Sequence, residues 1–291
     1  MFNYSIEEEY RKMSIRIITD STSDIAQGEI KGVTVLPMTV TIGGVDYKDG
    51  INISKDEFYK KQEAGENTIT SLITPLEFSE AYEEVTKAGD EAIVLPISSA
   101  LSGTYQSAVT AAMDYENISV IDTLQVTATL KILVLRALQL IEEGKTRSEI
   151  IETLEEEKKR IVAFAAVDTL EYLQKGGRIS KGAAIAGGLL NLKPILTLKD
   201  GALIAIGKAR GSKQSHLFLD QKIKEVGGID YSMPYATGYS GCDKAKLLEY
   251  MDDNPNLINP APHEVEIVQV GSAVGTHAGP GLVLVTFFSR K

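Results

Sequence analysis

The sequence predicts an α/β fold with two parts: an N-terminal parallel-sheet, three-layer domain and a second α+β domain with a partly antiparallel sheet. Two observations lead to this prediction. Through the first half of the chain, short β-branched or apolar runs alternate with helical patterns, which is typical of a parallel sheet covered by helices on both faces. After about residue 162, glycine and lysine become frequent and short alternating runs appear, which favours an antiparallel arrangement.

The first half contains the clearer patterns. We expect strands at Ile15–Thr19, Val33–Val40, Ala92–Ile97 and Ile118–Asp122. Helix starts are marked by Ser54, which is followed by Glu57 as in a capping box, and by Pro75 in a first turn. The expected helices are Ser54–Ala64, Pro75–Lys87, Gly103–Tyr115, Leu124–Glu143 and Arg147–Arg160.

These patterns divide the chain into an N-terminal α/β domain over residues 13–161 and a C-terminal α+β domain over residues 162–291. Residues 1–12 form an extension whose status the sequence leaves open. In the second domain we expect strands at Lys193–Leu198, Leu203–Gly207, Glu264–Val270 and Leu282–Phe288.

Composition narrows the class of protein. The chain has 291 residues, of which 43% are hydrophobic and 24% charged, enough for a sizeable core and two domains. A net charge of −10 argues against nucleic acid as a partner, because binding to phosphate backbones is driven by basic surface. The single cysteine, Cys242, excludes an intramolecular disulfide and a cysteine zinc cluster, so we expect no metal and a reducing, cytoplasmic location.

Membrane insertion is not expected either. The apolar segment Val126–Ile141 is interrupted by Lys131 and Arg136, so a buried helix is the better interpretation. The first dozen residues are acidic and polar, unlike a secretory signal.

A hydroxyl-rich turn, Ser98–Thr104, is the most informative local feature. It follows a buried strand and precedes a helix, so it combines backbone N–H groups, hydroxyls and Gly103 at the carboxyl edge of a sheet. Because the turn contains no Lys or Arg, it favours a weakly charged headgroup such as a carboxylate, held by hydroxyls and amides rather than by salt bridges. The alternative is that these residues only cap the helix.

A basic stretch stands out against the acidic total. Eight basic residues and one acid lie between Lys175 and Lys213, a balance that suits an anion or an acidic protein surface. Arg178 and Arg210 are the sharper candidates, because a planar guanidinium matches a carboxylate or phosphate. A merely solvated face is the alternative interpretation.

The third feature is a glycine-rich segment, Gly275–Gly281, which we expect to form a loop between the last two strands. It holds His277, whose imidazole could hydrogen-bond an oxygen or move a proton. We expect the other two histidines, His216 and His263, to be surface residues.

Five motifs in order resemble those of the DegV family, and the resemblance covers the chain from Met13 to the C-terminus. The motifs are Ile17–Asp24 (IITDSTSD), Thr70-Ser71 ahead of Pro75, the Ser98–Thr104 turn, Leu173–Ile179 (LQKGGRI) and the His277 segment.

This resemblance implies a two-domain fatty-acid-binding protein that is not itself an enzyme and needs no cofactor. It implies that a long-chain acyl tail lies between the domains, with Thr70, Ser71, Ser98 and Ser99 contacting the carboxylate. It further implies that Arg178, Arg210 and His277 lie near the exposed carboxyl, where a separate fatty acid kinase subunit would dock to form acyl phosphate. The apolar segment Ala183–Leu192 could line the cavity, or could be an ordinary buried helix.

The chain departs from the family pattern at one place. The usual Thr-Ser-Gln-Pro run is replaced by Thr70-Ser71-Leu72-Ile73-Thr74-Pro75, which is two residues longer. Any of Thr70, Ser71 and Thr74 is therefore a candidate for the carboxylate contact.

Enzyme hypotheses remain as alternatives. A serine hydrolase could use Ser98, Ser99 or Ser102 with His277 and an aspartate such as Asp20 or Asp122. A phosphotransferase could use the same turn. The chain lacks a Gly-x-Ser-x-Gly pattern around the turn and shows no nucleotide loop, which favours binding over turnover.

Overall fold

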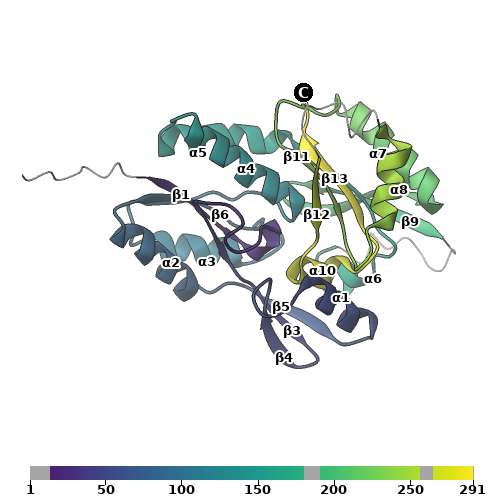
Figure 1. The fold of residues 1–291 in the computed structure, drawn as a ribbon, viewed down its shortest axis with the longest axis horizontal. Coiled ribbons are helices and arrows are strands. Elements are labelled where there is room, and N and C mark those ends of the chain that lie inside the picture. The colour runs from purple at the N-terminus through teal and green to yellow at the C-terminus, as the bar shows by residue number, and fades with distance from the viewer. Residues whose placement is uncertain (1–13, 180–190, 256–264, 291) are drawn as a thin grey trace, which may run out of the picture.

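The structure is a computed structural model, and it describes residues 14–179, 191–255 and 265–290. Three sheets organise these residues (Figure 1). A four-stranded sheet and a six-stranded sheet lie at the left and right of the view, and a small three-stranded sheet lies below them. The predicted α/β fold is confirmed.

The four-stranded sheet is entirely parallel, as predicted, with the strand order β2-β1-β6-β7. It comprises β1 (Ile15–Asp20), β2 (Val33–Leu36), β6 (Glu91–Leu95) and β7 (Ile118–Val120). The central strands are almost continuously apolar because helices cover both faces of the sheet.

Both faces carry helices, so the three-layer prediction is also confirmed. On one face, Ile18 and Val94 pack in a core with α2 (Pro75–Lys87) and α3 (Thr104–Ala112). On the other face, Ile17 and Leu95 pack with α4 (Ala128–Glu142) and α5 (Arg147–Glu157). The helix α2 has the bounds that the sequence predicted from Pro75 as its first residue.

The expected single strand Val33–Val40 is wrong. The chain forms β2 and then β3 (Thr39–Ile42), which pairs with β4 (Val45–Lys48) and β5 (Thr68–Ser71) in the three-stranded sheet. Pro37 separates the two strands, because proline has no N–H to donate to a sheet. Met38 then donates its amide to Ser21 Oγ, outside any strand pairing.

The six-stranded sheet has the order β10-β9-β8-β13-β11-β12 and is antiparallel except for the β11–β12 pair. Its strands are β8 (Ile161–Ala166), β9 (Leu192–Lys199), β10 (Ala202–Arg210), β11 (Tyr235–Tyr239), β12 (Glu266–Gln269) and β13 (Val283–Phe288). Helices α7 (Gly211–Glu225) and α8 (Ala245–Asp253) cover one face. The predicted partly antiparallel sheet is confirmed.

Helix α4 lies between the two large sheets. Leu130 and Leu133 pack with the parallel sheet, whereas Ala128 and Ile132 pack with the six-stranded sheet. Lys131 is 5% exposed, and its ammonium lies 2.8 Å from carboxylates of both Glu29 and Glu266. Among the described residues, no helix is long and apolar enough to cross a membrane.

The expected glycine-rich loop at Gly275–Gly281 is largely wrong. Residues 272–278 form the helix α10 (Ser272–Ala278), which ends at Gly279 with φ +67°. Gly275 is required for packing rather than for flexibility, because a Cβ there would lie 2.6 Å from Tyr59 Oη. The close contact with α1 (Lys55–Glu63) favours the helix over the intrinsic preference of glycine.

His216 was expected at the surface, and this is wrong. The residue is 4% exposed. Its Nδ1 lies 2.8 Å from Asp253 Oδ2, and its ring packs edge-on against Tyr250. The hydrogen-bond partner comes from α8, 37 residues away, so the local sequence around His216 does not indicate it. His263 and most of the segment Ala183–Leu192 lie outside the described residues.

The cap of α2 generates a first prediction. Thr74 Oγ1 accepts the amide of Glu77, and Glu77 accepts the amide of Thr74 at 2.8 Å, which completes a capping box. Replacing Thr74 with Ala should lower the free energy of unfolding by about 1 kcal/mol. The identical box formed by Thr146 and Glu149 on α5 supplies a matched variant, Thr146→Ala, with the same expected loss in urea unfolding. If Thr146→Ala lowers the free energy of unfolding and Thr74→Ala does not, the capping role of Thr74 is contradicted.

Candidate ligand-binding site

A cavity of about 440 Å³ lies where the carboxyl end of the parallel sheet faces the six-stranded sheet. This volume falls in the range of small-molecule sites. Most of its wall is apolar and comes from both halves of the chain: Met38, Leu72, Ile97, Leu101, Val126, Ala163, Ala165, Val167, Leu173, Leu196, Leu198, Leu203, Ala273, Val274, Ala278, Leu282 and Leu284.

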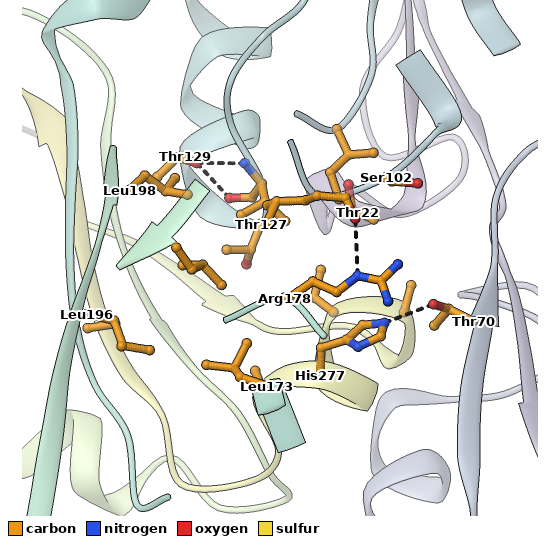
Figure 2. Close-up of a pocket in the computed structure, with 18 of the residues that line it drawn as sticks. Thr22, Thr70, Ser102, Thr127, Thr129, Leu173, Arg178, Leu196, Leu198 and His277 are labelled. Atoms are coloured by element: carbon orange, nitrogen blue, oxygen red, sulfur yellow. Dashed lines mark hydrogen bonds between the residues drawn. The ribbon is translucent and has the colours of Figure 1, made fainter. Parts of the chain in front are cut away.

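Arg178 and His277 lie together at one end of the cavity, which we call the polar end, whereas Thr127 and Thr129 lie near Leu198 (Figure 2). Leu196 and Leu198 of β9 lie on the side opposite to Thr70, whereas Arg178 and His277 lie next to Thr70. An amphiphilic ligand would therefore fit with its apolar part toward β9 and its polar part toward β5.

His277 and Thr70 form the centre of the polar end. His277 Nε2 lies 2.9 Å from Thr70 Oγ1. The other ring nitrogen, Nδ1, is buried without a hydrogen-bond partner among the described residues, and it packs so closely on Gly176 that a Cβ there would lie 2.1 Å away. A proton on Nδ1 would have no acceptor, so we assign the proton to Nε2, which donates to Thr70. The hydroxyl proton of Thr70 is then available to a ligand.

The imidazole is held in its neutral form. Burial, together with the neighbouring Arg178 guanidinium, lowers the pKa of His277 to about 4. Both causes act against the imidazolium, because a buried cation is poorly solvated and is repelled by another cation.

Arg178 follows α6 (Glu171–Lys175) and brings a positive charge into the polar end. Its Nε donates to Leu101 O at 3.2 Å and its Nη1 donates to Gly176 O at 2.5 Å. Leu101 belongs to the hydroxyl-rich turn, so the guanidinium contacts that turn although the two residues are 77 positions apart in the sequence. The turn itself contains no cation, but the fold brings the Arg178 guanidinium to it.

A second, more polar cleft of about 440 Å³ adjoins this end. Thr70, Arg178 and His277 line both the cavity and the cleft. The rest of the cleft wall includes Gln62, Glu66, Glu171, Tyr172 and Lys175. The polar end of the cavity is thus a wall shared with this cleft.

The structure brings four of the candidate site residues together and leaves the others apart. Thr70, Ser71, Arg178 and His277 line the cavity. Ser98 and Ser99 are outside its lining: Ser98 Oγ donates to Gly201 O, and Ser99 Oγ donates to Asp122 Oδ2. Thr74 caps α2, and Arg210 is exposed at the end of β10, outside the lining of both spaces.

Other hydroxyls also lie at the cavity wall. Ser102, a candidate only in the hydrolase alternative, lines the cavity from the predicted turn, and Thr22, which was not proposed as a site residue, lines it from the motif that follows β1. Thr127 and Thr129 line it at the start of α4. Thr127 has φ 52° and ψ −135°, a strained conformation for a β-branched residue, and no pattern in the sequence indicates it.

The geometry required by the hydrolase alternative is not assembled among the described residues. Ser102 Oγ hydrogen-bonds to Thr104 Oγ1, and the other two candidate serines hydrogen-bond to the partners given above. No carboxylate orients His277, since its Nδ1 packs on Gly176. Within the same part of the chain, no cluster of His, Cys, Asp and Glu could hold a metal ion.

The fold and this site define an α/β protein with a mainly apolar cavity between its two large sheets and a polar group of side chains at one end of that cavity. A family model described as uncharacterised proteins of the DegV family matches residues 14–290. The chain belongs to the DegV family, as its five motifs predicted.

Comparisons with known proteins agree with this assignment. A DegV domain-containing protein of Caldanaerobacter subterraneus subsp. tengcongensis is 40% identical over 287 residues, which span 95% of this chain and 99% of that protein. A fatty-acid-binding DegV family protein from Thermus thermophilus has a TM-score of 0.85 and 32% identity, covering 95% of this chain and 100% of that one. DegV from Bacillus subtilis, a fatty acid binding protein, has a TM-score of 0.79 and 29% identity, covering 94% and 98%.

The neutral state of His277 gives a prediction about pH. Because the pKa of His277 is lowered in the folded protein, the unfolded chain binds the proton more readily, and the stabilisation is present above the ordinary pKa of 6.5 and lost as the pH falls toward 4. Relative to His277→Gln, the wild type should lose about 3 kcal/mol of unfolding free energy between about pH 7.5 and about pH 4. Urea unfolding of both proteins at both pH values measures this difference, and the carboxylates common to both proteins cancel. A difference that does not vary with pH would contradict a lowered pKa.

Proposed function

We propose that this protein binds a long-chain fatty acid, with the acyl tail in the apolar cavity and the carboxylate at Thr70, Ser71 and Arg178. One observation carries the proposal: a cavity with a mainly apolar wall has a hydroxyl, a neutral imidazole and a guanidinium together at one end. The Thermus and Bacillus relatives, which share the fold over nearly their whole length, bind fatty acids and support this proposal.

The apolar wall accounts for affinity. Each buried CH₂ group contributes about 0.8 kcal/mol, so a chain of about sixteen carbons offers on the order of 12 kcal/mol before the cost of ordering it. Such a ligand needs a long apolar surface rather than many polar contacts, and both sheets supply that surface.

The polar end accounts for orientation. The Thr70 oxygen accepts from His277, so its hydroxyl proton points away from the imidazole and can be donated to a carboxylate. Arg178 adds a charge in the same place, and charge-assisted hydrogen bonds are stronger than neutral ones. In this proposal Ser98 and Ser99 shape the turn without touching the ligand, since both hydroxyls donate to protein atoms.

We further propose that the ligand lies between the domains of residues 13–161 and 162–291, and that the cytoplasmic protein presents the carboxylate to a separate, ATP-using fatty acid kinase subunit. The cleft beyond Thr70, Arg178 and His277 supports this idea, because it gives a path to the headgroup that does not cross the tail cavity. Lys175 and Arg178 give that cleft two cations that suit a phosphate group. Arg210 remains a candidate for the docking face, although it lines neither space.

The headgroup contact can be tested with a hydroxyl deletion. Purified protein should carry a fatty acid that mass spectrometry of a denatured extract identifies, and Thr70→Val should raise the Kd for that acid about 10-fold to 100-fold. The matched control is Thr41→Val, on the neighbouring strand, where the lost hydroxyl donates to Asp46. Wild-type protein that is empty, and stays empty after incubation with fatty acids, would overturn the proposed function. An unchanged Kd in Thr70→Val would remove Thr70 from the headgroup site.

The position of the tail can be tested by filling the cavity. Ala165 and Ala166 are neighbours on β8 that face opposite sides of the sheet, toward the cavity and toward α7 respectively. Each Ala→Leu change overpacks its side by about 1–3 kcal/mol of stability. Only Ala165→Leu should shift the preference toward shorter chains. We expect it to raise the ratio of the Kd for an 18-carbon acid to the Kd for a 12-carbon acid about tenfold. An equal shift in both variants would place the tail elsewhere.

A further inference from the structure

Helix α10 belongs to the second half of the chain but docks against the first half. It lies beside α1 and β5 at the base of the molecule (Figure 1). Ala273, Val274, His277 and Ala278 of this helix all line the cavity. The place of α10 therefore decides the place of the imidazole that contacts Thr70.

Two buried carboxylates from the first half hold the beginning of this helix. Asp49 Oδ1 accepts the amide of Ser272 at 3.0 Å as well as its hydroxyl, and Asp49 Oδ2 accepts the amide of Ala273 at 3.3 Å. Asp24 Oδ1 accepts the amide of Gly271 at 2.6 Å. Three consecutive backbone amides are thus bound by side chains more than 200 residues away.

Neighbouring groups from α1 bind the same segment. Lys55 Nζ donates to Gln269 O at 2.6 Å and lies 3.9 Å from Asp24, and Tyr59 donates to Val270 O. Gln62 donates to Gly275 O at 3.0 Å. A helix of seven residues has little stability of its own, so these contacts and its packing set its position.

Asp24 also reaches the opposite wall of the cavity. Its Oδ2 accepts the hydroxyl of Thr127 at 2.5 Å, and Thr127 is the strained residue that begins α4. One carboxylate therefore joins the two helices, α4 and α10, whose first turns border the cavity. Burial raises the pKa of Asp24 to about 6, and the nearby Lys55 opposes this shift.

We propose that Asp24 and Asp49 are positioning residues of the headgroup site, which fix the first turn of α10 and thereby hold His277 in register with Thr70. The ligand-affinity part of this inference rests on the proposed function, whereas the position of His277 does not. A carboxylate suits this task because both of its oxygens accept hydrogen bonds, whereas an amide side chain of the same shape has one accepting oxygen and one donating NH₂ group.

The test is Asp49→Asn with Asp90→Asn as the control. In Asp49→Asn the new NH₂ group faces a backbone N–H or the Ser272 hydroxyl, so one amide of α10 loses its acceptor. Asp90 is also a buried carboxylate that accepts a backbone amide, from Ser14, but it lies beyond both linings and does not hydrogen-bond to α10. Both variants should lose stability.

Two readouts separate positioning from general destabilisation. In ligand-free protein, NMR titration of the His277 ring should show its pKa rising by about one unit or more in Asp49→Asn, since a displaced imidazole is less buried. Palmitate binding should weaken about tenfold in the same variant. Asp90→Asn should leave both quantities at their wild-type values.

The outcomes are distinct for each proposal. An unmoved His277 titration in Asp49→Asn, or an equal shift in Asp90→Asn, would overturn the positioning role even if wild-type protein binds palmitate. Wild-type protein that binds no fatty acid would overturn the proposed function and leave the titration as the test of positioning. If Asp49→Asn does not fold, Ser272→Ala removes only one hydroxyl from Asp49 and should shift the His277 titration in the same direction by a smaller amount; an unmoved titration there also overturns the inference.

Discussion

The docking of α10 into the first half of the chain is the constraint on which the cavity depends. This short helix lines the cavity between the two large sheets, and it supplies apolar side chains as well as the imidazole of the polar end. Its polar backbone groups are bound by Asp24, Asp49 and Gln62, because a buried amide or carbonyl without a partner is costly. The two halves therefore meet through specific hydrogen bonds and not only through apolar contact.

Helix α4 is the second shared element, and it explains how one chain builds a cavity between two sheets. Successive faces of this helix pack on the parallel sheet and on the six-stranded sheet. Lys131 on the same helix forms ion pairs with a glutamate from each half, so the charge on this buried side chain is compensated. A helix with two buried faces is apolar nearly all round, which explains the long apolar segment in its sequence.

Local signals predicted most of the framework. Pro75 marked the first turn of α2, and the alternation of strands and helices predicted the parallel sheet. The errors lie where a distant contact decides the local structure. Gly275 lies in a helix that packs closely against Tyr59 and Phe58. His216 is buried beside Tyr250 and hydrogen-bonds to Asp253.

The site residues also divide into those that the local sequence indicated and those whose contacts depend on distant parts of the chain. Thr70, Ser71, Arg178 and His277 were recognisable as motif residues, and the structure brings these four to one cavity. The hydroxyls of Ser98 and Ser99 are bound to protein atoms that only the fold brings near, Gly201 and Asp122. The charge of Arg178 reaches the serine turn through Leu101 O, a contact between segments that no local pattern connects.

Thr70, Arg178 and His277 line both the apolar cavity and the polar cleft. In the proposed binding mode, two rates are thereby uncoupled. Release of the ligand requires the whole tail to leave an apolar cavity and is slow in proportion to the surface it exposes. Contact with the headgroup requires only that a partner in the cleft displace water. A carrier built in this way can keep its cargo for a long time and still let the cargo's reactive end be sampled many times during each binding event.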